Sequence, residues 1–382
     1  MAIRIPSLGR LDAPFDLARS GERTSYIQAG QRFGLLEACK GLAACIIVGH
    51  HFCEYSPRSN VADQFAPNLM YGIYNYGLFV VHMFFVFGGF VLAITMPDQP
   101  ISWKKAWLAF GLRYLRLAPP YIVMLLLLIA ASRAMLGHVM NPPLIDSFSW
   151  WQLMAHVFFL QDILGYGNLS AGTWYLCIDL QYAAFFLLIQ SVINTIGKNT
   201  PQEDFGPVAM SAILFPLGIV STWYWSRELA NDIYVFYFLG SLVLGTLVGW
   251  TLQGRIHWLI FPLYVIAMTA SLFIDLRPRI LVALVSSMTI YAVVRFFPKV
   301  LVPRPLLWLG KVSYSLFLIH YLVNGLVLHG LNAWVGSSPF RAFASMIVAF
   351  TASLLAAAAL HYWIEAPCHR WVKSIGRNTD AG

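Results

Sequence analysis

The stretch KGLAACIIVGHHF, residues 40–52, is apolar apart from a lysine at its start and two adjacent histidines near its end. It lies within a longer hydrophobic segment, which is typical of a membrane-spanning helix. Ionisable side chains at such depth are costly in a bilayer and mark candidate functional sites. Histidine is the side chain that changes its protonation most easily near neutral pH. The stretch therefore predicts a transmembrane helix that carries a functional histidine.

The composition supports a membrane protein. Of 382 residues, 59% are hydrophobic and 11% are charged, whereas about 25% of the residues in a soluble domain are charged. We expect one integrated all-α domain with about ten transmembrane helices, because each needs about 17–25 apolar residues. They are expected at 35–53, 72–95, 117–136, 173–195, 207–225, 233–252, 258–274, 280–297, 306–329 and 342–363. The apolar segment 150–161 is short and precedes a Gly-rich turn, which indicates a partial or interfacial helix.

Charge placement predicts the topology, since lysine and arginine accumulate in short cytoplasmic loops. With ten spans and a cytoplasmic N-terminus, most of the 25 lysines and arginines fall on the cytoplasmic side. A full span at 150–161 would reverse the predicted orientation of every later span and loop. We therefore predict a cytoplasmic segment at 1–34, without a signal peptide, a membrane domain at 35–372 and a cytoplasmic tail at 373–382.

Other function classes receive little support from the sequence. The net charge of +8 follows from this topology and from contact with anionic headgroups, so it does not indicate nucleic-acid binding. The five cysteines show no CxxC or Cys/His spacing for a metal site, and we expect no metal. No Gly/Ser-rich or Pro-rich linker divides the chain.

Six motifs occur in a fixed order along the chain. The segment 40–52 comes first, and the others are VHMFFVFGGF (81–90), RYLRLAPPY (113–121), TWYLCIDLQY (173–182), LGKVSYSLFLIH (309–320) and EAP (365–367). Together they resemble the membrane-bound acyltransferase 3 family, whose members O-acylate sugars and other cell-surface or secreted molecules. The resemblance runs from about residue 35 to 372, without the esterase-like domain that many relatives append.

The resemblance implies roles for several positions. His51 falls in the catalytic slot of the family's first helix, and Lys40 stands where the family usually has arginine. Gly88 replaces a serine of the second motif, while Asp179 replaces the usual glutamate. The lysine keeps its charge but loses the bidentate fork of arginine.

The resemblance also implies the reaction partners. The donor is acetyl-CoA or another short acyl-CoA, and the acceptor is a hydroxyl of a sugar in a glycan, exopolysaccharide or lipid-linked glycan. The setting is the bacterial cytoplasmic (inner) membrane, with its lipid bilayer and other polysaccharide-assembly proteins as candidate partners.

Chemistry assigns roles to the same residues. A positioned imidazole can remove the proton of an attacking alcohol, so His51 is the candidate general base. Asp179 is expected to accept a hydrogen bond from the other ring nitrogen of His51. Arg113, Arg116 and Lys40 are expected near the cytoplasmic end, where they would hold the phosphates of CoA. His50 points about 100° away around the helix, which favours a structural role.

Further residues are candidates for the substrate cavity or for structural contacts. His82, Trp174, Tyr314 and His320 are predicted to line the cavity, although His82 and His320 suit pairing between helices equally well. Glu365 is predicted to have a structural or gating role. Two other functions stay open: acylation of a small secondary metabolite such as a macrolide, and proton-coupled transport or lipid flipping by the buried histidines and aspartate.

Overall fold

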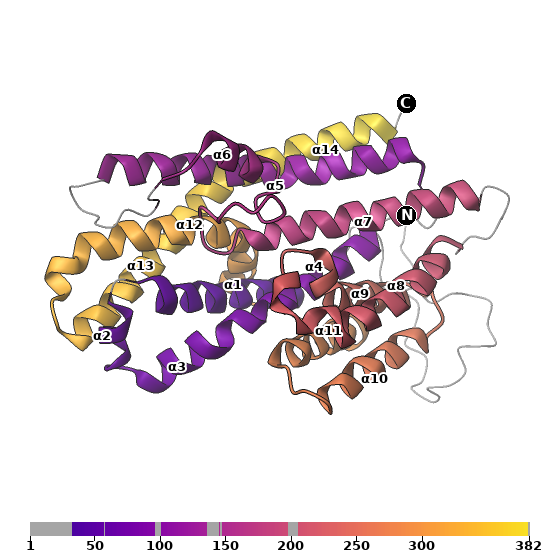
Figure 1. The fold of residues 1–382 in the computed structure, drawn as a ribbon, viewed down its shortest axis with the longest axis horizontal. Coiled ribbons are helices and arrows are strands. Elements are labelled where there is room, and N and C mark those ends of the chain that lie inside the picture. Colours follow the sequence, from indigo (N-terminus) through magenta and orange to yellow (C-terminus); the bar gives the residue numbers. More distant parts are fainter. Residues whose placement is uncertain are drawn as a thin grey trace, which may run out of the picture.

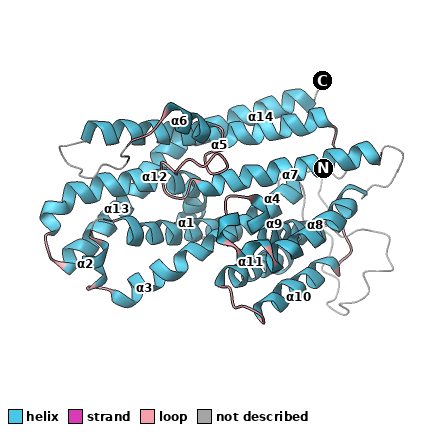
Figure 2. Cartoon of the chain, in the orientation of Figure 1, coloured by secondary structure: helices cyan, strands magenta, loops and turns pink. Residues whose placement is uncertain are grey.

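A computed structural model describes residues 33–56, 58–95, 101–135, 145, 147–197 and 205–380. Nearly all of the predicted N-terminal segment and the last residues of the tail lie outside these ranges. Within them, every regular element is a helix (Figure 2). The prediction of an all-α membrane protein is therefore confirmed.

Nine helical segments are long and apolar enough to cross a membrane in the described part of the chain. They contain α1 (Gly34–Tyr55), α3 with α4 (Pro67–Tyr76, Val81–Thr95), α5 (Trp103–Met135), α7 (Trp174–Ile196), α8 (Phe205–Trp223), α9 (Val235–Leu252), α11 (Pro278–Phe296), α12 (Arg304–Val335) and α13 with α14 (Pro339–Leu360, Ala366–Asp380). The tenth predicted span, 258–274, is helix α10 (Ile260–Leu272). Its 13 residues extend only about 20 Å, less than the hydrocarbon core.

Two shorter elements lie between these helices. Helix α6 (Trp150–Val157) covers only part of the apolar segment 150–161, so the predicted partial helix is confirmed. Ser149 caps it by accepting a hydrogen bond from the Gln152 backbone N–H. Helix α2 (Ser59–Asp63) connects α1 with α3.

The helices lie side by side along the long axis of the molecule (Figure 1). Their buried side chains form two large apolar clusters, beside a small one of Ile101, Ala106 and Leu187. The first gathers α4, α8, α9, α10 and α11, and the second gathers α5, α12 and α13. Helices α1 and α7 contribute to both clusters. Polar residues on these two helices are therefore held at the seam between the clusters.

Glycines bring two pairs of helices close together. A Cβ at Gly89 of α4 would clash with the Leu242 carbonyl of α9, and one at Gly245 would clash with the Val86 carbonyl. Gly41 of α1 and Gly310 of α12 meet in the same way. Small residues at such positions allow van der Waals contact between backbones, which drives helix association in lipid.

Helix α5 begins earlier than the span predicted at 117–136. It runs unbroken from Trp103 through the prolines at 119 and 120, so Arg113 and Arg116 are helical. The prolines lack the N–H groups that would bond the carbonyls four residues earlier. The Tyr314 hydroxyl donates to the neighbouring Leu117 carbonyl at 2.8 Å, which ties this part of α5 to α12.

Candidate active site

His51 and His320 form the central contact of the site. Nδ1 of His51 lies 2.8 Å from Nε2 of His320, and the two rings are stacked with centroids 5.0 Å apart. The other nitrogen of His320, Nδ1, lies 2.7 Å from the Phe317 carbonyl oxygen. Since a carbonyl only accepts, His320 carries its proton on Nδ1 when neutral. Its Nε2 then accepts the proton of His51 Nδ1, which leaves Nε2 of His51 with a free lone pair.

The partner predicted for His51 is therefore corrected. Asp179 binds Arg113 instead: its two oxygens accept hydrogen bonds from Arg113 Nη2 at 2.6 Å and Nε at 3.1 Å. Both side chains are largely buried, and the guanidinium fork is the strongest donor available to a buried carboxylate. Asp179 therefore pairs with Arg113 instead of contacting His51.

His51 faces a polar cavity of about 770 Å³, which we call the His51 chamber. Its wall includes Trp174, whose ring stacks on Phe238 with centroids 5.4 Å apart. His50 also lines it, with Nδ1 2.9 Å from the Tyr74 carbonyl and Nε2 3.4 Å from a Glu54 oxygen. These contacts agree with a structural role for His50.

A second cavity of about 530 Å³, the Arg113 chamber, contains the three predicted cations together: Lys40, Arg113 and Arg116. Arg116 Nε donates to His369 at 3.3 Å. Lys40 and His51 are separated by about 16 Å along α1. The two chambers are therefore offset along the helix axis.

Glu365 lies in the Arg113 chamber at the end of a π-helical turn, His361–Glu365. Its Oε2 accepts a hydrogen bond from the Ser315 hydroxyl at 2.7 Å and lies 2.9 Å from His361 Nδ1. A π turn adds one residue to the helical circuit and is common at functional sites. Here it connects α13 to α14 while directing a buried carboxylate inward.

Two residues predicted for the substrate cavity lie elsewhere. Tyr314 lines the Arg113 chamber. His82 is bonded to the Ser241 hydroxyl at 3.0 Å beside a void of about 10 Å³, and within the described residues it lines neither chamber. His320 lies against His51, so its role combines pairing between helices with contact to the candidate base.

Gly172 and Phe317, which the sequence did not single out, separate the chambers. A Cβ on Gly172 would lie 2.8 Å from the Phe317 ring and 3.3 Å from Cε1 of His51. The φ angle of Gly172 is +79°, a conformation that glycine adopts without steric cost. Gly172 lines the His51 chamber and Phe317 the Arg113 chamber. Their contact therefore forms a thin partition beside the His51 ring.

The loop that carries Gly172 is fixed by His156 of α6. Burial lowers the pKa of His156 to about 4, so its imidazole is neutral near pH 7 and has one acceptor and one donor nitrogen. Nδ1 accepts from the Tyr121 hydroxyl at 2.7 Å, and Nε2 lies 3.2 Å from the Gly167 carbonyl. The short helix therefore positions one wall of the His51 chamber.

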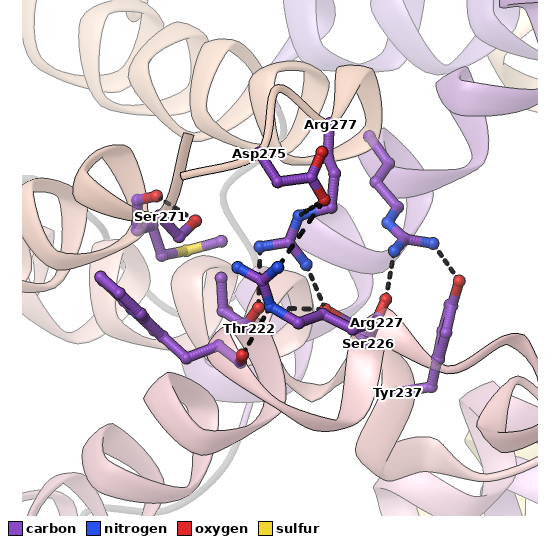
Figure 3. A network of polar contacts seen from close by, with 10 residues as sticks. Thr222, Ser226, Arg227, Tyr237, Ser271, Asp275 and Arg277 are labelled. Atoms are coloured by element: carbon purple, nitrogen blue, oxygen red, sulfur yellow. Dashed lines mark hydrogen bonds and ion pairs between the residues drawn. The ribbon is translucent and has the colours of Figure 1, made fainter. Parts of the chain in front are cut away.

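A separate polar network anchors the loop between α8 and α9 (Figure 3). Arg277 donates to the Ser226 hydroxyl at 2.8 Å and to the Thr222 carbonyl at 2.9 Å. Arg279 bonds the Ser226 carbonyl and the Tyr237 hydroxyl. This loop continues to Asp232, which lines the His51 chamber.

No group of three or more histidine, cysteine or acidic side chains in the described ranges is placed to hold a metal ion.

In comparisons with known proteins, a family model described as an acyltransferase domain matches residues 34–362. Neither curated proteins nor solved structures gave a match.

Proposed function

Because the chain belongs to the acyltransferase 3 family, we propose that it is a membrane O-acyltransferase that uses acetyl-CoA or another short acyl-CoA. The acceptor is a hydroxyl of a sugar in a glycan, exopolysaccharide or lipid-linked glycan. The observation that carries the proposal is the His51–His320 pair, which presents Nε2 of His51 beside the boundary of two chambers. The family favours this function over a proton-coupled transporter.

The proposed reaction balances without a further reactant. Nε2 of His51 takes the proton of the acceptor hydroxyl as its oxygen forms a bond to the thioester carbonyl carbon. The carbon–sulfur bond then breaks, and the thiolate of CoA takes the proton from the imidazolium. His320 fixes the tautomer of His51 and shares its positive charge through the 2.8 Å contact. Such a base contributes about 10²–10⁴-fold to a rate.

The charges of the two chambers support the placement of the substrates. CoA carries phosphates, which suit guanidinium and ammonium groups, and Lys40, Arg113 and Arg116 line one chamber. Arg113 uses Nε and Nη2 on Asp179, so its Nη1 group remains available for a phosphate oxygen. The acceptor hydroxyl would approach His51 from the other chamber. We place the Arg113 chamber on the cytoplasmic side of the inner membrane, with both termini cytoplasmic.

The test is acyl transfer by cells and purified protein with His51→Ala. Mass spectrometry of cell-surface glycans, with and without the gene, should show an acyl group that disappears in the variant. His329→Ala is the matched control, because among the described residues the ring of His329 hydrogen-bonds to the Gly325 carbonyl of its own helix and lines neither chamber. A His51→Ala protein that inserts and folds normally but transfers at the normal rate would contradict the proposal. A product found on a small metabolite would instead support the macrolide-type acceptor.

A further inference from the structure

The His51 chamber has the opposite charge to the Arg113 chamber. Its charged lining residues are Glu54 and Asp232, and none of the described residues around it is a lysine or arginine. The Arg113 chamber is lined by three such cations and by two carboxylates, Asp179 and Glu365, so its net charge is positive. A charged ligand is therefore sorted between the two chambers by its sign.

Both carboxylates belong to exposed residues that line the chamber. Glu54 lies one helical turn after His50 near the end of α1, and its side chain is 39% exposed. The arginine network anchors the loop between α8 and α9 (Figure 3). Asp232 belongs to the part of this loop that precedes α9. Burial and, after it, repulsion from the neighbouring Asp162 carboxylate raise the pKa of Asp232. A cation at this position would offset that repulsion.

Neutral polar groups complete the wall. Ser170 is only 3% exposed, and within the described residues its Oγ has no hydrogen-bond partner. A buried hydroxyl without a partner is unfavourable, and Ser170 lines the chamber. Its hydroxyl is thus available to a ligand oxygen or nitrogen. The side chains of Asn75, Gln152 and Tyr74 add polar and aromatic surface to the same wall.

We propose that the His51 chamber selects a glycosyl acceptor that carries no carboxylate or phosphate, and that it favours one bearing a protonated amine. The role of the ligand as an acyl acceptor rests on the proposed function, whereas the charge selectivity depends only on the residues that line the chamber. An acidic sugar would meet two carboxylates and, among the described lining residues, no lysine or arginine. A neutral or amine-bearing sugar would meet hydrogen-bonding groups and a favourable potential.

Charged thiol reagents test the selectivity without any acyl transfer. Ser147 is exposed and lines the chamber, so Ser147→Cys supplies a target, and none of the five native cysteines lines it. The unsubstituted protein gives the background. The probes are the cationic trimethylammonium-ethyl and the anionic sulfonatoethyl methanethiosulfonates, and each rate is divided by its rate with free mercaptoethanol.

We expect the normalised cationic rate to exceed the anionic rate by about tenfold or more at low salt. The ratio of the cationic to the anionic rate should approach 1 in the double variant Glu54→Gln/Asp232→Asn. It should also approach 1 in about 1 M NaCl, where the Debye length is about 3 Å. Equal rates, or a faster anionic reagent, would overturn the inference. The His51→Ala experiment reports on catalysis separately, so either conclusion can fail alone.

A second measurement uses matched acceptors. Methyl glucoside and methyl glucuronide differ by one carboxylate, and methyl glucosaminide adds an amine. The purified protein should transfer acetyl to the glucuronide with a kcat/KM about tenfold or more below that for the glucoside. Asp232→Lys should reduce this difference in kcat/KM between the two acceptors. Equal or preferred use of the glucuronide by the unsubstituted protein would contradict the proposal.

Discussion

At the scale of single residues, the two adjacent histidines on α1 have different surroundings. His50 is held by a backbone carbonyl and a carboxylate, whereas His51 is held by one nitrogen of His320. Because His320 donates its own proton to the Phe317 carbonyl, it can only accept from His51 while neutral. The basic nitrogen of His51 is thereby fixed on the side away from His320.

Substitutions of His320 test this arrangement. His320→Ala should lower kcat by about 100-fold with little change in KM for acyl-CoA, because the tautomer of His51 is no longer fixed. His320→Gln can place an amide oxygen near the position of the imidazole Nε2, so it should recover part of the loss. Steady-state kinetics and the pH profile of kcat measure both effects. A glutamine variant as slow as the alanine variant, or a raised KM alone, would argue against a positioning role.

Asp179 is predicted to act through Arg113 rather than His51. Asp179→Asn removes the charge that balances a largely buried guanidinium, which should destabilise the protein by about 3 kcal/mol and raise KM for acyl-CoA more than it lowers kcat. Asp275→Asn is the control, because that carboxylate is half-exposed and its ion pairs with arginine should contribute about 1 kcal/mol or less. Thermal unfolding in detergent gives the stability. A large fall in kcat with an unchanged KM for acyl-CoA would instead support the pairing of Asp179 with His51 that the sequence predicted.

The sequence indicated individual site residues better than their pairing. Lys40, Arg113 and Arg116 were expected together and line one chamber. His51 and His320 are 269 positions apart, so their contact depends on how α1 and α12 pack, which residue spacing within one helix does not contain. Ser170 and Gly172 had no signal beyond a Gly-rich turn, since their importance comes from what the folded chain places against them.

At the scale of helices, the contact of Gly41 with Gly310 sets the register of α1 against α12. His51 and His320 each lie ten residues beyond their glycine, or about 15 Å at the helical rise. Because both pairs are in contact, the two helices run in the same direction. The glycines therefore determine whether the histidines meet.

Gly310→Ala should disturb both stability and catalysis. Its methyl group would clash with the Glu37 carbonyl, so the helices must separate, at a cost of about 1–3 kcal/mol. Acyl transfer should fall along with the stability because the His51–His320 contact lengthens. Gly330→Ala on the same helix is the control, since nothing lies within 4 Å of its Cβ position. Equal melting temperatures and rates for the two variants would show that the glycine contact does not set the register.

Local patterns predicted the helices well but missed their irregularities. Apolar length alone identified nine of the ten predicted segments as spans. The start of α5 at Trp103 was not expected, because the predicted span begins at 117. The contact of Tyr314 with the Leu117 carbonyl, which ties α5 to α12, is likewise visible only in the folded chain. The π turn at Glu365 has no sequence signature, since it depends on Ser315 and His361 converging on one carboxylate.

At the scale of the whole molecule, the two clusters of helices enclose two chambers of opposite charge that meet at Gly172 and Phe317. In the proposed reaction, the thioester would pass this partition to reach His51, while the bulk of CoA would stay with the cations. Such a division allows donor and acceptor to arrive from opposite faces of the membrane. It follows that the donor should be usable from one face only.

Sealed vesicles of defined orientation test that sidedness. Radiolabelled acetyl-CoA added outside inverted vesicles meets the Arg113 chamber and should be turned over, whereas right-side-out vesicles should be slower by about tenfold or more, since a bilayer excludes the charged phosphates. Permeabilising the right-side-out vesicles with detergent should restore the rate, which controls for the amount of active protein. A His51→Ala preparation gives the background in each orientation. Efficient turnover by intact right-side-out vesicles would show that the donor enters through the His51 chamber, and the assignment of the two chambers would then have to be reversed.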